Sequence, residues 1–215
     1  MTGFTNSPRL TKGALVGWDI WNPLSSVVVF QYNPSTMTRT LEARVSKEDG
    51  DPGEVTRLSG PPKESIKLSL EIDAADQMEK DKAESGIYPA LSALETMLYP
   101  KSAEIIKNSV LALLGSREIM STEAPLVFLV WGIKRVLPVR ITSFSITEEA
   151  YDPSLNPILA KVDLSLTVLT YQDFSVLHPG FSMFMVHQVA KEIMATVNTF
   201  NNPQNFTSVL PARLR

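Results

Sequence analysis

Residues 145–171 read SITEEAYDPSLNPILAKVDLSLTVLTY, and they decide the fold because a strand pattern stops, turns and resumes within them. In the second half, apolar and polar residues alternate strictly, which is typical of a strand with one buried face. The inward residues are Val162, Leu164, Leu166 and Val168, and the outward ones are Asp163, Ser165 and Thr167. The stretch therefore predicts two long antiparallel strands joined by an acidic, proline-containing loop.

The strand before this loop, within residues 135–149, also alternates, but its phase shifts midway. Val139 and Ile141 share one parity, whereas Phe144 and Ile146 share the other. One extra residue in the strand would return both pairs to the same face, as β-bulges do where strands bend. The pattern predicts a bulge near residues 142–143.

Further strands are indicated on both sides. Residues 64–74, ESIKLSLEIDA, alternate cleanly and predict a half-buried antiparallel strand, whereas residues 125–132, PLVFLVWG, predict a strand buried on both faces. The β-rich runs at 25–34 and 36–45 flank Asn33-Pro34-Ser35 and predict a hairpin or a tight strand corner. Residues 46–62 are rich in glycine, proline and charge and predict a loop.

Three segments have helical spacing. Residues 87–98 place Ile87, Leu91, Leu94 and Leu98 on one side and predict a helix that covers the sheet. Residues 102–115 are a second apolar candidate that ends at Gly115. From Met183 onward, a helix of four to five turns is predicted with one apolar side. That side carries Met183, Val186, Val189, Ile193, Val197 and Phe200.

Six or seven strands interrupted and followed by helices indicate an α+β fold. We expect an antiparallel β-barrel with flanking helices and a C-terminal amphipathic helix. The expected organisation is a barrel domain over residues 1–180, a helical insertion around 85–120, and a helical extension over 181–215.

Composition excludes several classes of function. The chain has 215 residues, 44% of them hydrophobic and 20% charged, with a net charge of −3 and no cysteine. Disulfides, zinc–thiolate sites and cysteine nucleophiles are thereby excluded, and the basic footprint of nucleic-acid binding is missing. We expect no signal peptide, because the first residues contain no continuous apolar region, and no membrane-spanning helix.

Catalytic and metal-binding patterns are not found. The two histidines, His178 and His187, have no metal-ligand spacing with acidic residues, and we expect them to be surface or hydrogen-bonded side chains. Glu148, Glu149 and Asp152 invite a hydrolytic interpretation, but adjacent strand residues point to opposite faces and do not converge. The sequence also lacks phosphate-loop, nucleophile-elbow and dinucleotide motifs. We expect no enzyme activity, no cofactor and no metal.

Two stretches combine into a family pattern. Residues 27–40, VVVFQYNPSTMTRT, contain an apolar strand, an F-x-Y-N-P motif and a later T-R step, and residues 127–169 contain a W-G strand end and a P-V-R-I-T-S hairpin. The motif residues are Trp131, Gly132, Pro138, Arg140, Glu148, Glu149, Tyr151, Pro153, Asn156 and Pro157. Over roughly residues 13–174, the chain resembles the contractile injection system tube-protein family.

This resemblance implies a structural subunit with a fold like that of phage-tail tube proteins. Such a subunit would form a six-fold ring at the end of the inner tube and join it to the baseplate and spike. The implied partners are other copies of the chain, the inner tube protein, and spike, hub and baseplate proteins, with neither nucleic acid nor membrane. Assembly would occur in the cytoplasm, within a phage-tail-like particle that is released or membrane-associated.

Two alternatives stay open beside this expectation. One is a cap-side subunit that terminates the tube, and the other is an unrelated β-barrel enzyme or ligand-binding protein. The family includes members with a C-terminal LysM module, which the region after Met183 is too short to contain. The C-terminal helix would either pack on its own barrel or dock on a neighbouring subunit or layer.

The acidic loop and the C-terminal helix are the predicted assembly interface. Prolines fix the backbone of the loop, so it could dock with little loss of entropy. The predicted interface residues are Glu148, Glu149, Tyr151, Asp152, Pro153, Asn156, Pro157, Met183, Val186, Ile193 and Val197.

Overall fold

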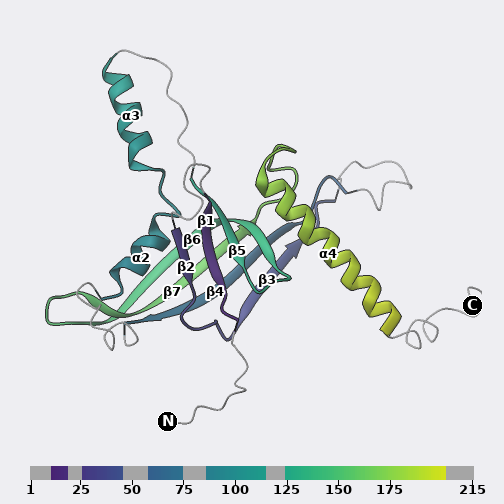
Figure 1. The fold of residues 1–215 in the computed structure, drawn as a ribbon, viewed down its shortest axis with the longest axis horizontal. Coiled ribbons are helices and arrows are strands. Elements are labelled where there is room, and N and C mark those ends of the chain that lie inside the picture. The colour runs from purple at the N-terminus through teal and green to yellow at the C-terminus, as the bar shows by residue number, and fades with distance from the viewer. Residues whose placement is uncertain (1–10, 19–25, 46–57, 75–85, 115–123, 202–215) are drawn as a thin grey trace, which may run out of the picture.

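A computed structural model describes residues 11–18, 26–45, 58–74, 86–114 and 124–201 of the chain. These residues form an α+β fold with a seven-stranded sheet and three helices (Figure 1). The elements are β1 (Ala14–Trp18), β2 (Ser26–Val29), β3 (Met37–Glu42), β4 (Lys63–Asp73), α2 (Tyr88–Glu95), α3 (Ser102–Leu113), β5 (Leu126–Val130), β6 (Val136–Tyr151), β7 (Pro157–Val168) and α4 (Pro179–Asn201).

The strands follow the order β2-β1-β5-β6-β7-β4-β3, and every neighbouring pair is antiparallel. The long strands β6 and β7 form the centre, as the alternating patterns predict. Strand β1 pairs with β5, and β4 pairs with β7. The early strands of the chain are therefore attached to the centre of the sheet by pairing with strands that are distant in sequence.

The predicted inward faces are confirmed. Strands β4 and β7 bury alternate side chains, and β5 buries Val127, Phe128 and Leu129 in succession. The inward residues of the two alternating strands are Ile66, Leu68, Leu70, Ile72, Val162, Leu164, Leu166 and Val168. The bulge is confirmed too, since the register of β6 against β7 shifts between Ile141 and Ser143, and the Thr142 Oγ1 donates to the Ser165 carbonyl at 3.0 Å.

The predicted hairpin at Asn33-Pro34 is wrong, and the corner is what the structure contains. Strands β2 and β3 lie at opposite edges of the sheet, and residues 30–36 cross between them. The Asn33 side chain holds this crossing, because its Oδ1 accepts from the Gly13 nitrogen at 2.8 Å and its Nδ2 donates to the Thr11 carbonyl at 3.0 Å. So short a crossing spans at most about 25–30 Å, which requires a strongly curled sheet.

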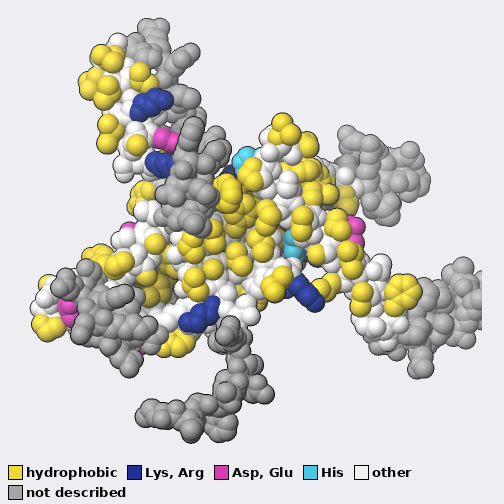
Figure 2. Space-filling view, in the orientation of Figure 1, with side chains coloured by type: hydrophobic (Ala, Val, Ile, Leu, Met, Phe, Trp, Pro, Cys, Tyr) yellow, Lys and Arg dark blue, Asp and Glu magenta, His cyan; other side chains and the backbone are white. Residues whose placement is uncertain are grey.

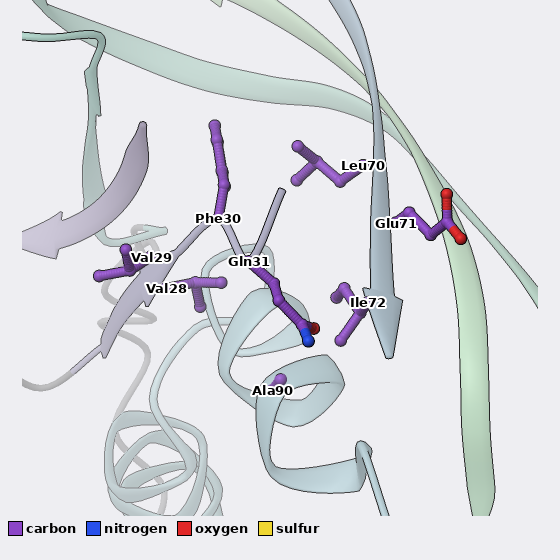
Figure 3. A pocket seen from close by; sticks show the side chains of 8 residues that line it. All are labelled: Val28, Val29, Phe30, Gln31, Leu70, Glu71, Ile72 and Ala90. Atoms are coloured by element: carbon purple, nitrogen blue, oxygen red, sulfur yellow. The ribbon is translucent and has the colours of Figure 1, made fainter. Parts of the chain in front are cut away.

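The predicted closed barrel is also wrong, because β2 and β3 each have one strand neighbour. Beyond β2, the chain meets β4 through side chains, and the Gln31 Oε1 accepts from the Asp73 nitrogen at 2.9 Å. A cavity of about 30 Å³ lies at this junction, lined partly by Phe30, Leu70 and Ala90 (Figure 3). Barrel closure needs a ladder of backbone hydrogen bonds between the edge strands β2 and β3, and the described residues do not form one.

Helices complete the core of the curled sheet. Leu91 and Leu94 of α2 are buried together with the flanking Ile87 and Met97, which confirms a helix that covers the sheet. By contrast, α3 buries none of its residues and stands away from the sheet (Figure 1). The first turns of α4 contribute Phe184 to the core. No helix within the described ranges has the length and apolarity needed to cross a membrane.

Candidate assembly surfaces

The distal part of the β6–β7 hairpin extends beyond the core and carries the predicted loop (Figure 1, the green loop at the left). Its base is buried, whereas Tyr151 and Leu155 near the tip are 51% and 78% exposed. The hairpin thus presents side chains to solvent on a support that the core strands hold in place.

The tip is shaped by one carboxylate. The Asp152 Oδ1 accepts from the backbone nitrogens of Ser154 at 2.7 Å and Asn156 at 2.8 Å, and its Oδ2 accepts from the Asn156 Nδ2 at 2.8 Å. The bonds from the side chain and backbone of Asn156 lower the pKa of Asp152 below its ordinary value. Leu155 adopts a φ of 63°, a conformation that is uncommon for residues other than glycine. The tip is therefore a defined turn with Pro153 and Leu155 exposed.

The two glutamates contact different neighbours. Glu149 lies where the register of β6 against β7 shifts, and its Oε1 accepts from the Lys161 Nζ at 2.7 Å. A hydrogen bond with Glu148 raises the pKa of Tyr151 above its ordinary value. Both glutamates therefore have separate local partners on the flank of the hairpin.

Pro157 was predicted to belong to the assembly interface, but it is buried. Its carbonyl accepts from the Ile87 nitrogen at 2.9 Å, which ties the hairpin to the start of α2. Gly86 has a φ of 55°, and a Cβ there would lie 2.2 Å from the Pro157 carbonyl oxygen, so only glycine fits. Pro157 thus anchors the hairpin, and surface contact with a partner falls to its exposed neighbours.

The apolar side of α4 is exposed along its length. We define the α4 stripe as Val186, Val189, Ile193, Val197 and Phe200, which are 66%, 47%, 58%, 48% and 82% exposed. Met183, the first predicted member, is half-buried. The face that packs on the sheet carries Phe184 and His187, so the alternative in which the stripe packs on its own sheet is wrong.

A buried polar cluster lies under α4, and none of its residues is among the predicted site residues. Glu64 is 4% exposed, and its Oε1 accepts from the Arg39 Nε at 2.8 Å, while the Lys191 Nζ lies 3.7 Å from its Oε2. Glu64 shares the parity of the inward Ile66, and that parity is the signal that predicts its burial. Charged groups at a buried position require partners, which β3 and α4 provide.

His187 belongs to the same region, and the expectation of a surface residue is wrong for it, because it is 7% exposed. Its ring nitrogens lack a well-formed hydrogen bond among the described residues, and a weaker interaction with the Lys134 backbone favours the charged form. Burial lowers its pKa, and the charge of Lys191 acts in the same direction. His178, the other histidine, stacks on Phe174 at 4.8 Å between ring centroids.

Beside this cluster, a groove of about 340 Å³ runs between α4 and the start of β4, lined partly by Leu41, Tyr171 and Phe184. The described part of the chain contains no group of three or more His, Asp or Glu side chains that could hold a metal ion.

The outward side of the sheet is divided into two surfaces. The polar sheet face, on β4, β6 and β7, consists of short hydroxyl and charged side chains. It carries Lys67, Ser69, Glu71, Ser143, Ser145, Thr147, Lys161, Asp163, Ser165 and Thr167. The apolar sheet face, on β1, β2 and β5, carries Ala14, Val16, Trp18, Val27, Val29, Leu126, Phe128 and Val130. Figure 2 shows apolar side chains gathered over these three strands.

Comparison with protein-family models and with curated proteins gives no match for this chain. The surfaces described above and the motifs of the sequence are therefore the basis for a functional proposal.

Proposed function

We propose that this chain is a structural subunit of a contractile injection system. In this role it forms a ring at the end of the inner tube and joins the tube to the baseplate and spike. The expected symmetry is six-fold, and the subunit has no catalytic role. The resemblance of residues 27–40 and 127–169 to the tube-protein family supplies this specific identity.

One observation carries the assembly role: large apolar surfaces are exposed on elements that project from a well-packed core. The α4 stripe extends past the last buried residue of its helix, and Val27 and Val29 are 43% and 56% exposed on the sheet. Contiguous apolar patches of this kind on a soluble chain mark sites of contact with other proteins.

The polar sheet face supports the same role. In a ring of tube-like subunits, one face of each sheet borders a water-filled channel. Ser165 and Thr167 in β7 pair across the sheet with Lys67 and Ser65 in β4, which gives a hydrated surface without apolar side chains. The α+β fold with a central antiparallel hairpin is compatible with a tube-like subunit, although its sheet is open.

The test is electron microscopy of the purified full-length chain, followed by co-purification with the inner tube, spike and cap proteins of its own particle. Closed rings that bind the tube and spike proteins are the expected result. Rings that bind the cap protein instead would support the alternative of a cap-side subunit that terminates the tube. A chain that stays monomeric alone and with all three partners would overturn the proposal.

A truncation refines this test. Because Phe184 and His187 pack against the sheet and Glu192 lies beyond them, a stop codon after Glu192 spares the packed part of α4. The shortened chain should keep its far-ultraviolet circular dichroism and thermal unfolding but lose ring formation. Deleting from Ser182 would remove core contacts as well, and its result would be ambiguous.

A further inference from the structure

Among the described residues, helix α4 is attached to the sheet through its first turns. Its buried residues are Gly180, Phe184 and His187, whereas every residue from Glu192 to Asn201 is exposed. The attached part packs on β6. The position of the whole helix therefore depends on a small group of contacts near its start.

His178 caps the start of α4 with its ring. The residue directly precedes Pro179, where the helix begins, and its Nδ1 accepts from the Gly180 nitrogen at 3.1 Å. Its carbonyl accepts from the Phe181 nitrogen at 3.0 Å, as expected of the residue before a helix. Only a neutral imidazole can accept at Nδ1, because both nitrogens of the protonated ring are donors. The cap therefore requires the neutral form of this histidine.

The surroundings of His178 add one unfavourable and one neutral influence. A positive charge at the N-terminus of a helix is opposed by the helix dipole. The ring stacks on the uncharged Phe174, with 4.8 Å between the ring centroids. The carboxylate of Asp173 in the same turn already accepts from the nitrogen and hydroxyl of Thr170. A proton on His178 thus removes the cap without gaining a dedicated partner in this turn.

His187 lies farther along the packed side of the same helix. It is 7% exposed, and its ring nitrogens lack a well-formed hydrogen bond among the described residues. A buried charge without strong partners is costly. The packing of this ring against the sheet therefore also favours the neutral form.

The charges around this buried ring are mostly positive. Lys191 on α4 and Arg135 before β6 oppose a proton on it, whereas Glu64 on β4 and the Lys134 backbone favour one. Glu64 is already engaged, because its Oε1 accepts from the Arg39 Nε of β3 at 2.8 Å. A protonated ring would thus join three cationic side chains that share one carboxylate.

We propose that α4 is a pH-sensitive element, and that proton uptake by His178 and His187 releases its first turns from the sheet. These two residues are the histidines of the chain, and both lie where the helix is attached. Carboxylates ordinarily titrate near pH 4 and lysines near pH 10, so histidines are the side chains that change charge between pH 7.5 and pH 5. Release changes the position of the α4 stripe relative to the sheet. The inference goes beyond the proposed ring and does not depend on it.

The released state sets the size of the effect. A histidine with the ordinary pKa of 6.5 is about thirtyfold more protonated than neutral at pH 5. Burial holds the pKa of packed His187 below that value. The ratio of released to packed helix therefore rises by up to about thirtyfold between pH 7.5 and pH 5 from this residue alone.

Hydrogen exchange followed by mass spectrometry tests the release in a monomeric preparation of the full-length chain, because local opening exposes backbone amides. Rates at pH 7.5 and pH 5 are each divided by the rate of an unstructured peptide at the same pH. We expect protection over residues 182–190 of α4 to fall at least about fivefold at pH 5, whereas protection over residues 162–168 of β7 changes less than about twofold.

Three variants assign the effect to the histidines. His178→Asn keeps a cap that does not titrate, because an asparagine oxygen can accept from the helix nitrogens, and His187→Leu keeps apolar bulk. Each should reduce the pH effect, and together they should abolish it. Lys191→Met, at a side chain that is 37% exposed, removes a cation that opposes the protonated ring and should also reduce the effect.

Three results would overturn the inference. Protection that falls equally over α4 and β7 indicates global unfolding, and protection of α4 that does not change with pH excludes release. A double variant with the pH dependence of wild type shows that other groups control the helix. Should the double variant not fold, an unchanged pH effect in Lys191→Met counts against the proposal. Ring formation is measured separately, so the proposed function stands or falls independently of these outcomes.

Discussion

The two outward surfaces of the sheet differ although they belong to one continuous set of strands. Strand β7 alternates Val162 inward with Asp163 outward, whereas β5 buries Val127 and Phe128, which point to opposite sides. A strand with one apolar side is built for contact with water on the other side. A strand with two apolar sides needs cover on both, and Phe128 is already only 6% exposed in the single chain, whereas Val27 and Val29 on the edge strand β2 remain about half exposed.

Because of this difference, we expect residues of the inward face to affect stability and exposed apolar residues to affect assembly. The inward residues hold the fold, the polar sheet face tolerates solvent, and the apolar sheet face is exposed mainly along its edge, at Val27 and Val29. Substitutions on the three surfaces should therefore have effects of different kinds, and the following predictions are ordered by their expected effect on the stability of the single chain.

Leu166→Ala should have the largest effect, because Leu166 is fully buried between β4 and β6. Truncation of buried leucines lowers the free energy of unfolding by about 2–5 kcal/mol. Urea unfolding of a monomeric preparation measures the loss. Ser165→Ala on the outward side of the same strand should change the value by less than about 0.5 kcal/mol, and equal losses would mean that the two faces are assigned wrongly.

Lowering the pH should destabilise the fold through the polar cluster beneath α4. Because the pKa of buried His187 is below 6.5, the unfolded chain takes up a proton first as the pH falls. The stability that neutral His187 contributes to the folded chain is fully present above about pH 6.5. That stability is lost as the pH falls from there to the lower pKa of the folded state. Lys191 and Arg135 oppose a positive charge there, whereas Glu64 and the Lys134 backbone favour it.

Thermal unfolding across pH 7.5 to 5 tests this dependence. Wild type should lose stability as the pH falls through this range, and His187→Leu should show a flatter profile. Parallel profiles for the two proteins would show that another group controls the dependence.

Val29→Lys should leave the stability of the single chain within about 0.5 kcal/mol, since the site is 56% exposed on an edge strand. A lysine there would place a charge on the apolar sheet face and prevent assembly. Analytical ultracentrifugation should show the loss of rings in Val29→Lys but not in Ser69→Lys. Assembly lost in both variants, or in neither, would remove the distinction between the two sheet faces.

The double change Glu148→Gln, Glu149→Gln should affect folding least, because both side chains lie on the projecting hairpin. We expect unchanged thermal unfolding and weaker ring or layer assembly, measured by sedimentation. Normal assembly combined with the loss of a hydrolytic activity would contradict the structural role and favour an enzyme.

Local patterns predicted local structure well. The parity of Ile66 to Ile72 predicts an inward face, and the phase slip between Ile141 and Phe144 predicts the bulge, since both depend on neighbouring residues. The position of β2 and β3 at opposite edges depends on the pairing of β1 with β5 and of β4 with β7, which no local pattern encodes. For the same reason, the predicted barrel did not match the open sheet.

The candidate surfaces were predicted in part. The apolar spacing of α4 identified its stripe, but only the structure distinguishes the packed side with Phe184 from the exposed side. Pro157 was predicted in the assembly interface because prolines stiffen the acidic loop, whereas it is buried and its carbonyl is tied to the start of α2. The role of the remaining hairpin residues in assembly stays a prediction.

The crossing of residues 30–36 between the two edges has a consequence for the order of folding. Until β5, β6 and β7 are synthesised, the chain can form only two separate pairs, β1 with β2 and β3 with β4. Two-stranded hairpins are marginally stable alone in water, and pairing across long sequence separation makes folding slow. Translation past Val168 is therefore the event that joins the two pairs into one sheet, and Phe184 of α4 can pack on that sheet only afterwards.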